Sequence, residues 1–266
     1  MMSHETSPAE WGPRALFDLT GQLAVVTGGG RGIGRAIAEA LAACGATVAV
    51  CGRSLPALEE TVAAIGARGH NALALRMDVS SEQDVAQARE SLRAQFEGID
   101  ILVNNAGIDP HYASFEKTSI ADWNRIIDVN LNGVFRCCQL LGGTMLPRRR
   151  GAIINVSSIA GHVALKRQAP YCASKGGVEQ LTKALAYDWA EFGIRVNAIA
   201  YGFIKTDLTA AMVGHEHIAP RLLSRIPLGR FGDIGEVAGA ALFLASPAAS
   251  YVTGHSLAVD GGWTAS

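Results

Sequence analysis

The sequence predicts an α/β fold in which a parallel sheet of about seven strands is covered by helices on both faces. Two observations indicate this arrangement. From Gly21 onward, short apolar segments alternate with longer segments of helical character, and such alternation favours parallel strands joined by right-handed crossovers. Several of the short segments are apolar throughout, as strands buried on both faces are. The expected fold class is therefore a doubly wound α/β domain.

The individual elements follow from the same pattern. The expected strands cover residues 23–27, 47–51, 72–76, 101–104, 152–156, 195–200 and 256–259. The expected helices cover residues 35–44, 55–68, 81–96, 120–146, 171–192 and 236–245. Gly45 and Gly69 follow the first two helices, where glycine commonly ends a helix. Ser81 is a suitable N-cap for the third helix.

Length and composition predict a single domain. The chain has 266 residues and 49% of them are hydrophobic, which is enough apolar material for one large core. Residues 1–18 are expected to form a flexible arm, and residues 19–266 a single domain. The segment 203–230, called the flap below, mixes polar residues with two histidines and two prolines. Its length and position predict a mobile cover over a site.

Charge and cysteine content exclude several classes of partner. The formal net charge is −1 and no long basic run occurs, which argues against nucleic acid. No stretch of 18 residues is free of charge or glycine interruption, so no membrane span is expected. The five cysteines show neither Cys-x-x-Cys nor zinc-site spacing, so no metal site is expected. Buried thiols within helices and strands are the expected state of these cysteines, which favours a reducing, cytoplasmic setting.

A glycine-rich turn follows the first expected strand and precedes the first helix. It reads Thr27-Gly28-Gly29-Gly30-Arg31-Gly32-Ile33-Gly34. Glycines let the backbone approach a pyrophosphate closely, and the helix N-terminus attracts the anion. No Gly-Lys-Ser/Thr follows, which argues against a P-loop. The strand, turn and helix together predict a dinucleotide site in a Rossmann-type domain.

The end of the second strand indicates which dinucleotide is bound. An acidic residue at this position would bind the ribose 2′-hydroxyl, but the sequence there is Cys51-Gly52-Arg53-Ser54, with no carboxylate until Glu59. Arg53 can hold a 2′-phosphate through two parallel hydrogen bonds. Arg31 can approach the same phosphate from the glycine-rich turn. These two arginines predict NADP(H) in preference to NAD(H).

Tyr171 and Lys175 form a candidate proton-transfer pair. Residues i and i+4 share a helix face, so the ammonium can lie beside the phenol. Lowering a phenol pKa from about 10 to about 7 needs roughly 4 kcal/mol. A cation at ~4 Å supplies a similar amount at an effective dielectric of ~20. Tyr-x-x-x-Lys also occurs in ordinary amphipathic helices, so the rest of the sequence decides its meaning.

The motifs taken together resemble those of the short-chain dehydrogenase/reductase superfamily. The resemblance extends from Leu19 to Trp263. The motifs that carry it occur in the family's order and at compatible spacing: Thr27-Gly28-x-x-x-Gly32-x-Gly34, Asp78-Val79, Asn104-Asn105-Ala106-Gly107, Asn130, Ser158, Tyr171-x-x-x-Lys175, Asn197 and Asp260-Gly261-Gly262.

The resemblance implies a role for each matching residue. Tyr171 matches the acid/base, Ser158 the serine that steadies the substrate oxygen, and Lys175 the residue that lowers the tyrosine pKa while binding the nicotinamide ribose. Asn130 matches a helix asparagine that holds a water in a proton relay. Other matching positions imply cofactor contacts: Gly28, Gly30, Arg31, Gly32, Ile33, Gly34, Arg53, Ser54, Asp78, Val79, Asn105, Ala106, Gly107, Gly202, Ile204 and Thr206.

One position departs from the family pattern. The family usually has Pro-Gly after the sixth strand, whereas this chain has Tyr201-Gly202. Tyrosine restores the N–H donor that proline lacks and adds a large ring. Two interpretations are open: the ring turns to solvent, or it forms an aromatic wall that narrows the substrate pocket or stacks near the cofactor.

The expected function is reversible hydride transfer between the nicotinamide and a ketone or secondary alcohol. A carbonyl or 3-oxoacyl reductase ranks first, and a sugar-acid or polyol dehydrogenase of the gluconate 5-dehydrogenase type second. A non-catalytic NADP(H)-binding sensor is a third possibility, but such relatives usually lose the tyrosine or lysine, which this chain keeps. The resemblance also implies a homotetramer or dimer, formed through residues 120–146, 171–192 and 248–266.

Overall fold

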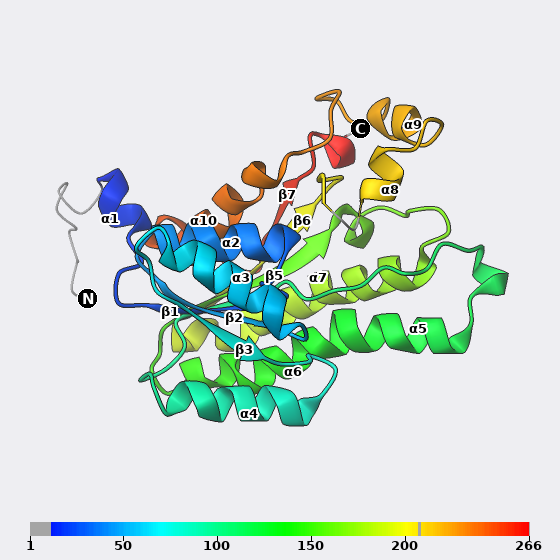
Figure 1. Ribbon diagram of the computed structural model, residues 1–266. Helices are drawn as coiled ribbons and strands as arrows, with labels where there is room; N and C mark the ends of the chain where they lie inside the picture. The colour runs from blue at the N-terminus through cyan, green and yellow to red at the C-terminus, as the bar shows by residue number, and fades with distance from the viewer. Residues whose placement is uncertain (1–11, 207–208, 266) are drawn as a thin grey trace.

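A single parallel sheet of seven strands organises the described part of the protein. The structure is a computed structural model, and it describes residues 12–206 and 209–265. The strand order is β3-β2-β1-β4-β5-β6-β7 (Figure 1). The strands are β1 (Leu23–Thr27), β2 (Thr47–Gly52), β3 (Ala72–Arg76), β4 (Ile101–Asn104), β5 (Gly151–Ser158), β6 (Ile194–Tyr201) and β7 (Ser256–Val259). The predicted fold class is confirmed.

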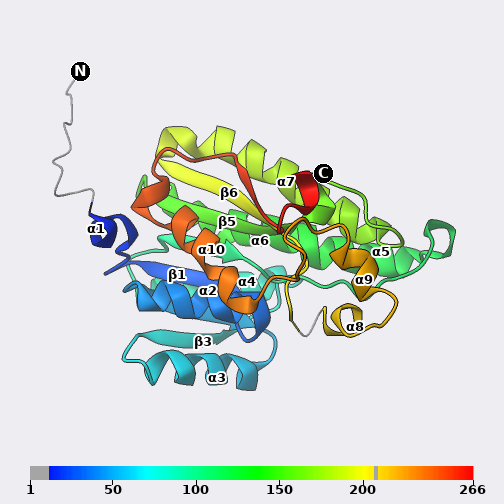
Figure 2. The same ribbon diagram turned by 90° about the horizontal axis from the view of Figure 1, so that it is seen from above.

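Helices cover both faces of this sheet. The α-helices are α1 (Pro13–Phe17), α2 (Gly32–Ala43), α3 (Leu55–Gly66), α4 (Glu82–Arg93), α5 (Ile120–Ile127), α6 (Gly133–Leu140), α7 (Ala169–Trp189), α8 (Ala210–Val213), α9 (Ala219–Leu223) and α10 (Ala238–Ala245). Figure 1 shows α2, α3 and α10 above the sheet and α4 and α6 below it. Figure 2 shows α8 and α9 on the opposite side of the molecule from α1.

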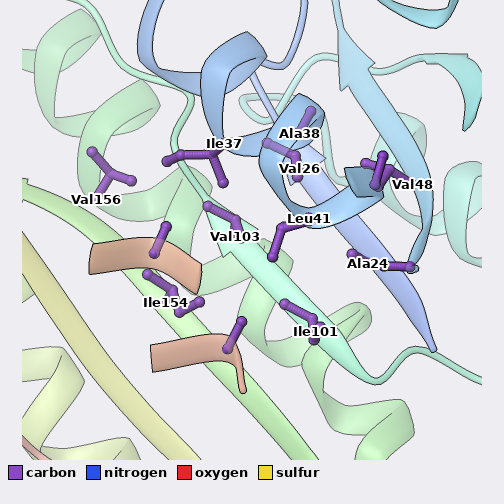
Figure 3. Close-up of a cluster of buried hydrophobic side chains, with 14 of the residues drawn as sticks. Ala24, Val26, Ile37, Ala38, Leu41, Val48, Ile101, Val103, Ile154 and Val156 are labelled. Carbon is purple, nitrogen blue, oxygen red and sulfur yellow. The ribbon is translucent and has the colours of Figure 1, made fainter. Parts of the chain in front are cut away.

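The two faces of the sheet carry separate hydrophobic cores. One core packs Ile37 and Leu41 of α2 against alternate strand residues such as Val26 and Ile154 (Figure 3). The other packs α4, α6 and α7 against the opposite face, through residues such as Leu92 and Val178. Successive strand residues point to opposite faces, so apolar strands such as Leu23-Ala24-Val25-Val26-Thr27 serve both cores.

The segment predicted as one helix over residues 120–146 is interrupted. It consists of α5, a π-helical turn over Asp128–Asn132, α6 and a 3-10 turn over Gly142–Met145. The hydrophobic spacing could not reveal the interruption, because the helices on both sides of the π-helical turn keep their own amphipathic pattern. π-Turns often occur at functional sites, and this one carries Asn130.

The two segments expected to be irregular contain short helices. Residues 13–17 of the expected arm form the short helix α1, which begins with Pro13 at a favourable first-turn position. The flexibility of the arm stays a prediction. Residues 1–11 lie outside the described residues. Within the flap, α8 and α9 form, and residues 207–208 lie outside the described part.

The strand order reverses between β1 and β4, and this places a crevice at the carboxyl ends of these two strands. β1 pairs with β2 on one side and with β4 on the other, so the connections after β1 and β4 leave toward opposite faces. In doubly wound folds, ligands bind outside the carboxyl ends of the strands at this point. The glycine-rich turn after β1 and the segment 105–108 after β4 therefore meet there.

Candidate active site

The residues predicted to bind cofactor and substrate meet in one cleft. The cleft has a volume of about 730 Å³ and lies at the carboxyl ends of the strands. All of the predicted cofactor and substrate residues line it: Gly28, Gly30, Arg31, Gly32, Ile33, Gly34, Arg53, Ser54, Asp78, Val79, Asn105, Ala106, Gly107, Ser158, Tyr171, Lys175, Tyr201, Gly202, Ile204 and Thr206. Asn130 lies behind this lining. Their individual roles stay predictions.

The glycine-rich turn has room only for glycine at its tightest points. A Cβ at Gly34 would lie 2.3 Å from the carbonyl oxygen of Gly28, because α2 begins directly against the turn. Gly28 has a φ of +66°, which favours glycine. At Gly32 the nearest atom to a Cβ is 4.0 Å away, so space opens beside the start of α2. A dinucleotide phosphate fits there, close to the helix N-terminus.

Thr27 and Asn105 hold the floor of the cleft. The Thr27 hydroxyl accepts hydrogen bonds from the backbone N–H groups of Asn105 and Ala106, both at 3.0 Å. The Asn105 side chain donates to the carbonyl oxygens of Thr27 and Gly28 at 3.0 and 3.2 Å. These bonds join the ends of β1 and β4, so the turn that would hold the phosphates is fixed before any ligand arrives.

The two arginines predicted to favour a 2′-phosphate stand at the same end of the cleft. Arg31 and Arg53 both line the cleft and are both exposed. Ser54, the N-cap residue of α3, lies beside them without a side-chain capping bond. Their side chains can therefore reach an added anion at little cost in broken contacts.

Tyr171 and Ser158 face each other across the other end of the cleft. Ser158 ends β5, and its hydroxyl accepts a hydrogen bond from the N–H of Ala160 at 3.1 Å. Tyr171 lies in the first turn of α7 and is partly exposed. Loss of hydration raises the pKa of the Tyr171 phenol to about 12, and the Ser158 hydroxyl acts in the opposite direction. The phenol is thus a proton donor at neutral pH.

Lys175 is buried beside the tyrosine. Only 4% of its surface is exposed, and its Nζ lies 5.7 Å from the centre of the Tyr171 ring. It donates a hydrogen bond to the carbonyl oxygen of Val156 at 2.8 Å. Burial lowers the pKa of Lys175 to about 8, and the nearby carboxylates of Glu179 and Asp109 act against this.

The pKa of Tyr171 is raised, whereas the Tyr-x-x-x-Lys spacing predicted that Lys175 would lower it. Burial outweighs the lysine because Nζ is directed to the Val156 carbonyl and lies above the ring, not within hydrogen-bonding reach of the phenol. Sequence spacing correctly placed the two groups together, but it could not give the orientation of the ammonium.

Asn130 is locked by its neighbours. It is fully buried in the π-helical turn. Its Oδ1 accepts from the N–H of Ile108 at 2.8 Å, and its Nδ2 donates to the carbonyl of Ile108 at 2.9 Å and to Ser174 Oγ at 3.2 Å. A Cβ at Gly107 would lie 3.5 Å from Asn130 Oδ1 and 3.7 Å from Lys175 Nζ. The amide oxygen and the ammonium therefore border the same small space.

Tyr201 is buried and does not turn to solvent. It is 3% exposed, packs in the core above the sheet, and donates a hydrogen bond from its hydroxyl to the carbonyl oxygen of Val237 at 2.6 Å. The solvent-facing interpretation is therefore wrong. The residue still lines the cleft, so the narrowing of the pocket stays a prediction. Its hydroxyl is already engaged and is not available to a substrate.

The flap packs on the C-terminal segment. The Trp263 ring contacts Phe203, with ring centres 5.0 Å apart and the planes tilted by 59°. The guanidinium of Arg225 lies over the same ring, 4.2 Å from its centre. Residues from α8 and α9 join this cluster and rest against Ile159 beside the site. The flap thus lies beside Ile159, next to Ser158 of the cleft, and its role as a mobile cover stays a prediction.

Several cleft residues were not identified from the sequence. They are Cys51, Gly52, Ala57, Leu58, Met77, Ile108, Val129, Val156, Ser157 and Thr209. Most are apolar or backbone contacts, for which residue type gives no signal. Two polar residues beside the cleft, Asp109 and Gln168, also received no role. Gln168 immediately precedes α7 and lies three residues before Tyr171. This short separation from the candidate acid/base is the one sequence feature that could have drawn attention to Gln168.

Three further properties concern the described residues. Across residues 12–206 and 209–265, no group of three or more His, Cys, Asp or Glu side chains could hold a metal ion. Within the same ranges, every helix is too short or too polar to traverse a lipid bilayer. The five cysteines are all unpaired thiols.

A glycine-rich dinucleotide turn opposite a serine, a tyrosine and a lysine defines an oxidoreductase that uses a nicotinamide nucleotide. Comparison with known proteins agrees. A family model described as enoyl-(acyl carrier protein) reductase matches residues 28–264. The chain belongs to the short-chain dehydrogenase/reductase superfamily, whose members here act on CH–OH and C=O groups.

Similar proteins differ in their named substrates. A galactitol 2-dehydrogenase (L-tagatose-forming) of Cereibacter sphaeroides is 43% identical over 94% of this chain and 98% of its own. A 3-oxoacyl-[acyl-carrier-protein] reductase of Synechocystis is 44% identical, covering 92% and 97%. A solved gluconate 5-dehydrogenase from Burkholderia cenocepacia, in complex with NADP and tartrate, is 38% identical with a TM-score of 0.91, covering 95% and 99%.

Proposed function

We propose that the protein transfers hydride between NADP(H) and a ketone or secondary alcohol, with Tyr171 as the acid/base. The observation that carries this proposal is the single cleft that holds the glycine-rich turn and two arginines at one end and Ser158, Tyr171 and Lys175 at the other. The nicotinamide nucleotide, when bound, supplies or accepts the hydride. The chain contributes binding, orientation and proton transfer.

The protein side of the reaction concerns the substrate oxygen. In reduction, the Ser158 hydroxyl and the Tyr171 phenol donate hydrogen bonds to the carbonyl oxygen, which stabilises the negative charge that develops there. Tyr171 then gives its proton to that oxygen. A pKa of about 12 keeps the phenol protonated at neutral pH and supports this direction. Lys175 and Asn130, which border one space beside Gly107, would return the proton through a water.

The preference for NADP(H) rests on charge at the adenosine end. Arg31 and Arg53 line this part of the cleft, and no carboxylate stands at the end of β2 to bind a ribose 2′-hydroxyl. A guanidinium pair suits a 2′-phosphate through charge-assisted hydrogen bonds. The NADP in the solved gluconate 5-dehydrogenase supports the same cofactor for a similar chain.

Two substrate classes remain as candidates within this function. A ketone or 3-oxoacyl reductase is the first, in line with the Synechocystis relative. A sugar-acid or polyol dehydrogenase is the second, in line with the galactitol and gluconate enzymes. A redox sensor without catalysis is disfavoured, because Ser158, Tyr171 and Lys175 are all present in one cleft.

We also propose a homotetramer or dimer in a cytoplasmic setting. Exposed aromatic residues on α6 and α7, Phe135 at 50% and Tyr187 at 89%, support contact between copies through these helices. The five unpaired thiols support a reducing compartment. Sedimentation of the purified protein tests the assembly.

A paired spectrophotometric screen tests the function. NADPH consumption is followed with a panel of ketones, 3-oxoacyl thioesters and keto sugars, and NADP⁺ reduction with the corresponding alcohols. The proposal expects turnover with at least one ketone and higher kcat/KM for NADPH than for NADH. Cofactor binding without turnover on any carbonyl or alcohol would instead support the sensor.

A further inference from the structure

The loop after β4 places one carboxylate, that of Asp109, near Tyr171 and Lys175 at the substrate end of the cleft. Ile108 lines the cleft, and Asn130 fixes both its backbone N–H and its carbonyl. Asp109 follows directly, so its backbone starts from a fixed point. Asp109 is the first residue of this loop with a charged side chain.

Gln168 orients this carboxylate. Its Nε2 donates a hydrogen bond to Oδ2 of Asp109, and Gln168 is the N-cap residue of α7. The same two loops meet again where the N–H of Ala113 donates to the carbonyl of Arg167 at 3.2 Å and where the Arg167 guanidinium lies 5.5 Å from the centre of the Tyr112 ring. The position of Asp109 is therefore set from two sides.

The second oxygen of Asp109 has no partner. Oδ1 is buried and makes no hydrogen bond to any described residue. Nearby His111 is committed elsewhere, because its Nε2 lies 3.0 Å from Thr118 Oγ1 and its Nδ1 4.0 Å from Asp122. A buried acceptor without a donor is unfavourable, so this oxygen is suited to a donor that arrives with a ligand.

Asp109 is close enough to the reacting groups to affect them. Its charge raises the pKa of both Tyr171 and Lys175, although burial dominates each of those two pKa values. Burial also raises the pKa of Asp109 itself to about 6. At pH 8 the carboxylate is ionised and accepts hydrogen bonds only.

We propose that Asp109, oriented by Gln168, accepts a hydrogen bond from a hydroxyl group on the carbon next to the reacting carbon. This inference rests on the proposed function and names its substrate class. The substrate is then a hydroxyketone or vicinal diol, such as a keto sugar, sugar acid or polyol. A 3-oxoacyl chain has only hydrogens on the carbons next to its ketone and cannot make this bond. A carboxylate at the adjacent carbon would be repelled.

A minimal pair of ketones tests this proposal. Acetoin (3-hydroxybutan-2-one) and butan-2-one differ by one hydroxyl at the adjacent carbon. Steady-state kinetics with NADPH at pH 8 should give a kcat/KM for acetoin that exceeds that for butan-2-one by at least about tenfold in the unmodified protein, because a site built for a hydroxyl rejects the analogue that lacks it.

Substitution of Asp109 should remove this preference. Asp109→Ala should lower the ratio of kcat/KM for acetoin to kcat/KM for butan-2-one roughly 10- to 100-fold, the effect of losing a hydrogen bond to a charged group, because only acetoin makes that bond. Asp109→Asn keeps the size of the side chain. In this variant Gln168 would still donate to the amide oxygen of the new side chain, whose NH₂ group would then face the substrate hydroxyl. The hydrogen bond from the substrate is lost in this variant too, so it serves as the test if Asp109→Ala does not fold.

The control and the contrary results are distinct. Glu116, an exposed carboxylate of the same loop that accepts from Ser114, serves as the control, and Glu116→Gln should change neither ketone. Equal losses on both ketones in the Asp109 variants, or no preference for acetoin in the unmodified protein, would overturn the proposal while leaving the proposed function intact. Absence of turnover with any carbonyl would overturn the proposed function and this inference with it.

Discussion

Replacing Lys175 by methionine separates a catalytic role from a structural one. Methionine has a similar length but no charge. At neutral pH the folded protein holds a charged, buried ammonium whose pKa has fallen from 10.5 to about 8. At 1.36 kcal/mol per pKa unit, this charge costs about 3 kcal/mol. The variant escapes that cost but loses the hydrogen bond to Val156, which contributes about 1.5–3 kcal/mol.

The two effects nearly cancel for stability and do not cancel for catalysis. The unfolding free energy of Lys175→Met should therefore equal that of the unmodified protein or exceed it by about 1–2 kcal/mol at pH 7. Turnover should fall at least about 100-fold, as for loss of a group needed in proton transfer. Urea denaturation and NADPH-dependent kinetics on the same preparation measure both quantities.

The pH dependence gives a further check on the same variant. Between the folded pKa of about 8 and the ordinary 10.5, the unfolded chain binds more protons, so stability of the unmodified protein rises with pH. The advantage of Lys175→Met should accordingly shrink from pH 7 to pH 10. A loss of several kcal/mol at pH 7, or native turnover, would refute the reasoning.

Four other substitutions test separate parts of the site. Arg53→Ala should raise KM for NADP⁺ at least about tenfold and leave NAD⁺ within about twofold; an equal loss for both would exclude a 2′-phosphate contact. Tyr201→Phe should lower the unfolding free energy by about 0.5–1.5 kcal/mol through loss of the bond to Val237, without changing turnover. Tyr201→Pro should alter substrate preference or cofactor affinity, and unchanged values of both would show that the ring does not shape the pocket. The carboxyl group of Asp109 has a pKa of about 6 in the folded protein and 3.8 in the unfolded chain. The stability of the unmodified protein should therefore fall as pH rises from about 4 to about 6, and Asp109→Asn should remove this dependence. Thermal unfolding at pH 5 and pH 7.5 measures this, and identical pH slopes for both proteins would contradict it.

The sheet could be predicted because its strands carry a strong signal. Segments such as 23–27 and 101–104 are apolar on both faces, and parallel strands covered by helices have this composition. The interruption of the helix at Asp128–Asn132 left no such signal. The partner of Asn130 in this π-turn, Ile108, lies in another part of the chain, so local spacing does not reveal it.

The glycine-rich part of the cleft could be predicted, because its backbone conformation requires glycine at particular positions. Gly28, Gly32 and Gly34 are required by close approach or positive φ, so their pattern survives in the sequence. The proposed role of Asp109 could not be predicted, because it depends on Oδ2 being bonded to Gln168 and on Oδ1 having no partner among the described residues. The direction of the Lys175 ammonium likewise depends on burial and on one carbonyl, which residue spacing does not encode.

The replacement of Tyr171 by phenylalanine tests the central claim most directly. The variant keeps the ring, and with it the packing at the start of α7, but has no proton to give. NADPH binding, followed by fluorescence titration, should stay within about twofold, while the rate of hydride transfer to a ketone in a single turnover falls at least about 100-fold. A single-turnover rate near that of the unmodified protein would contradict the account, because the proton would then come from another group.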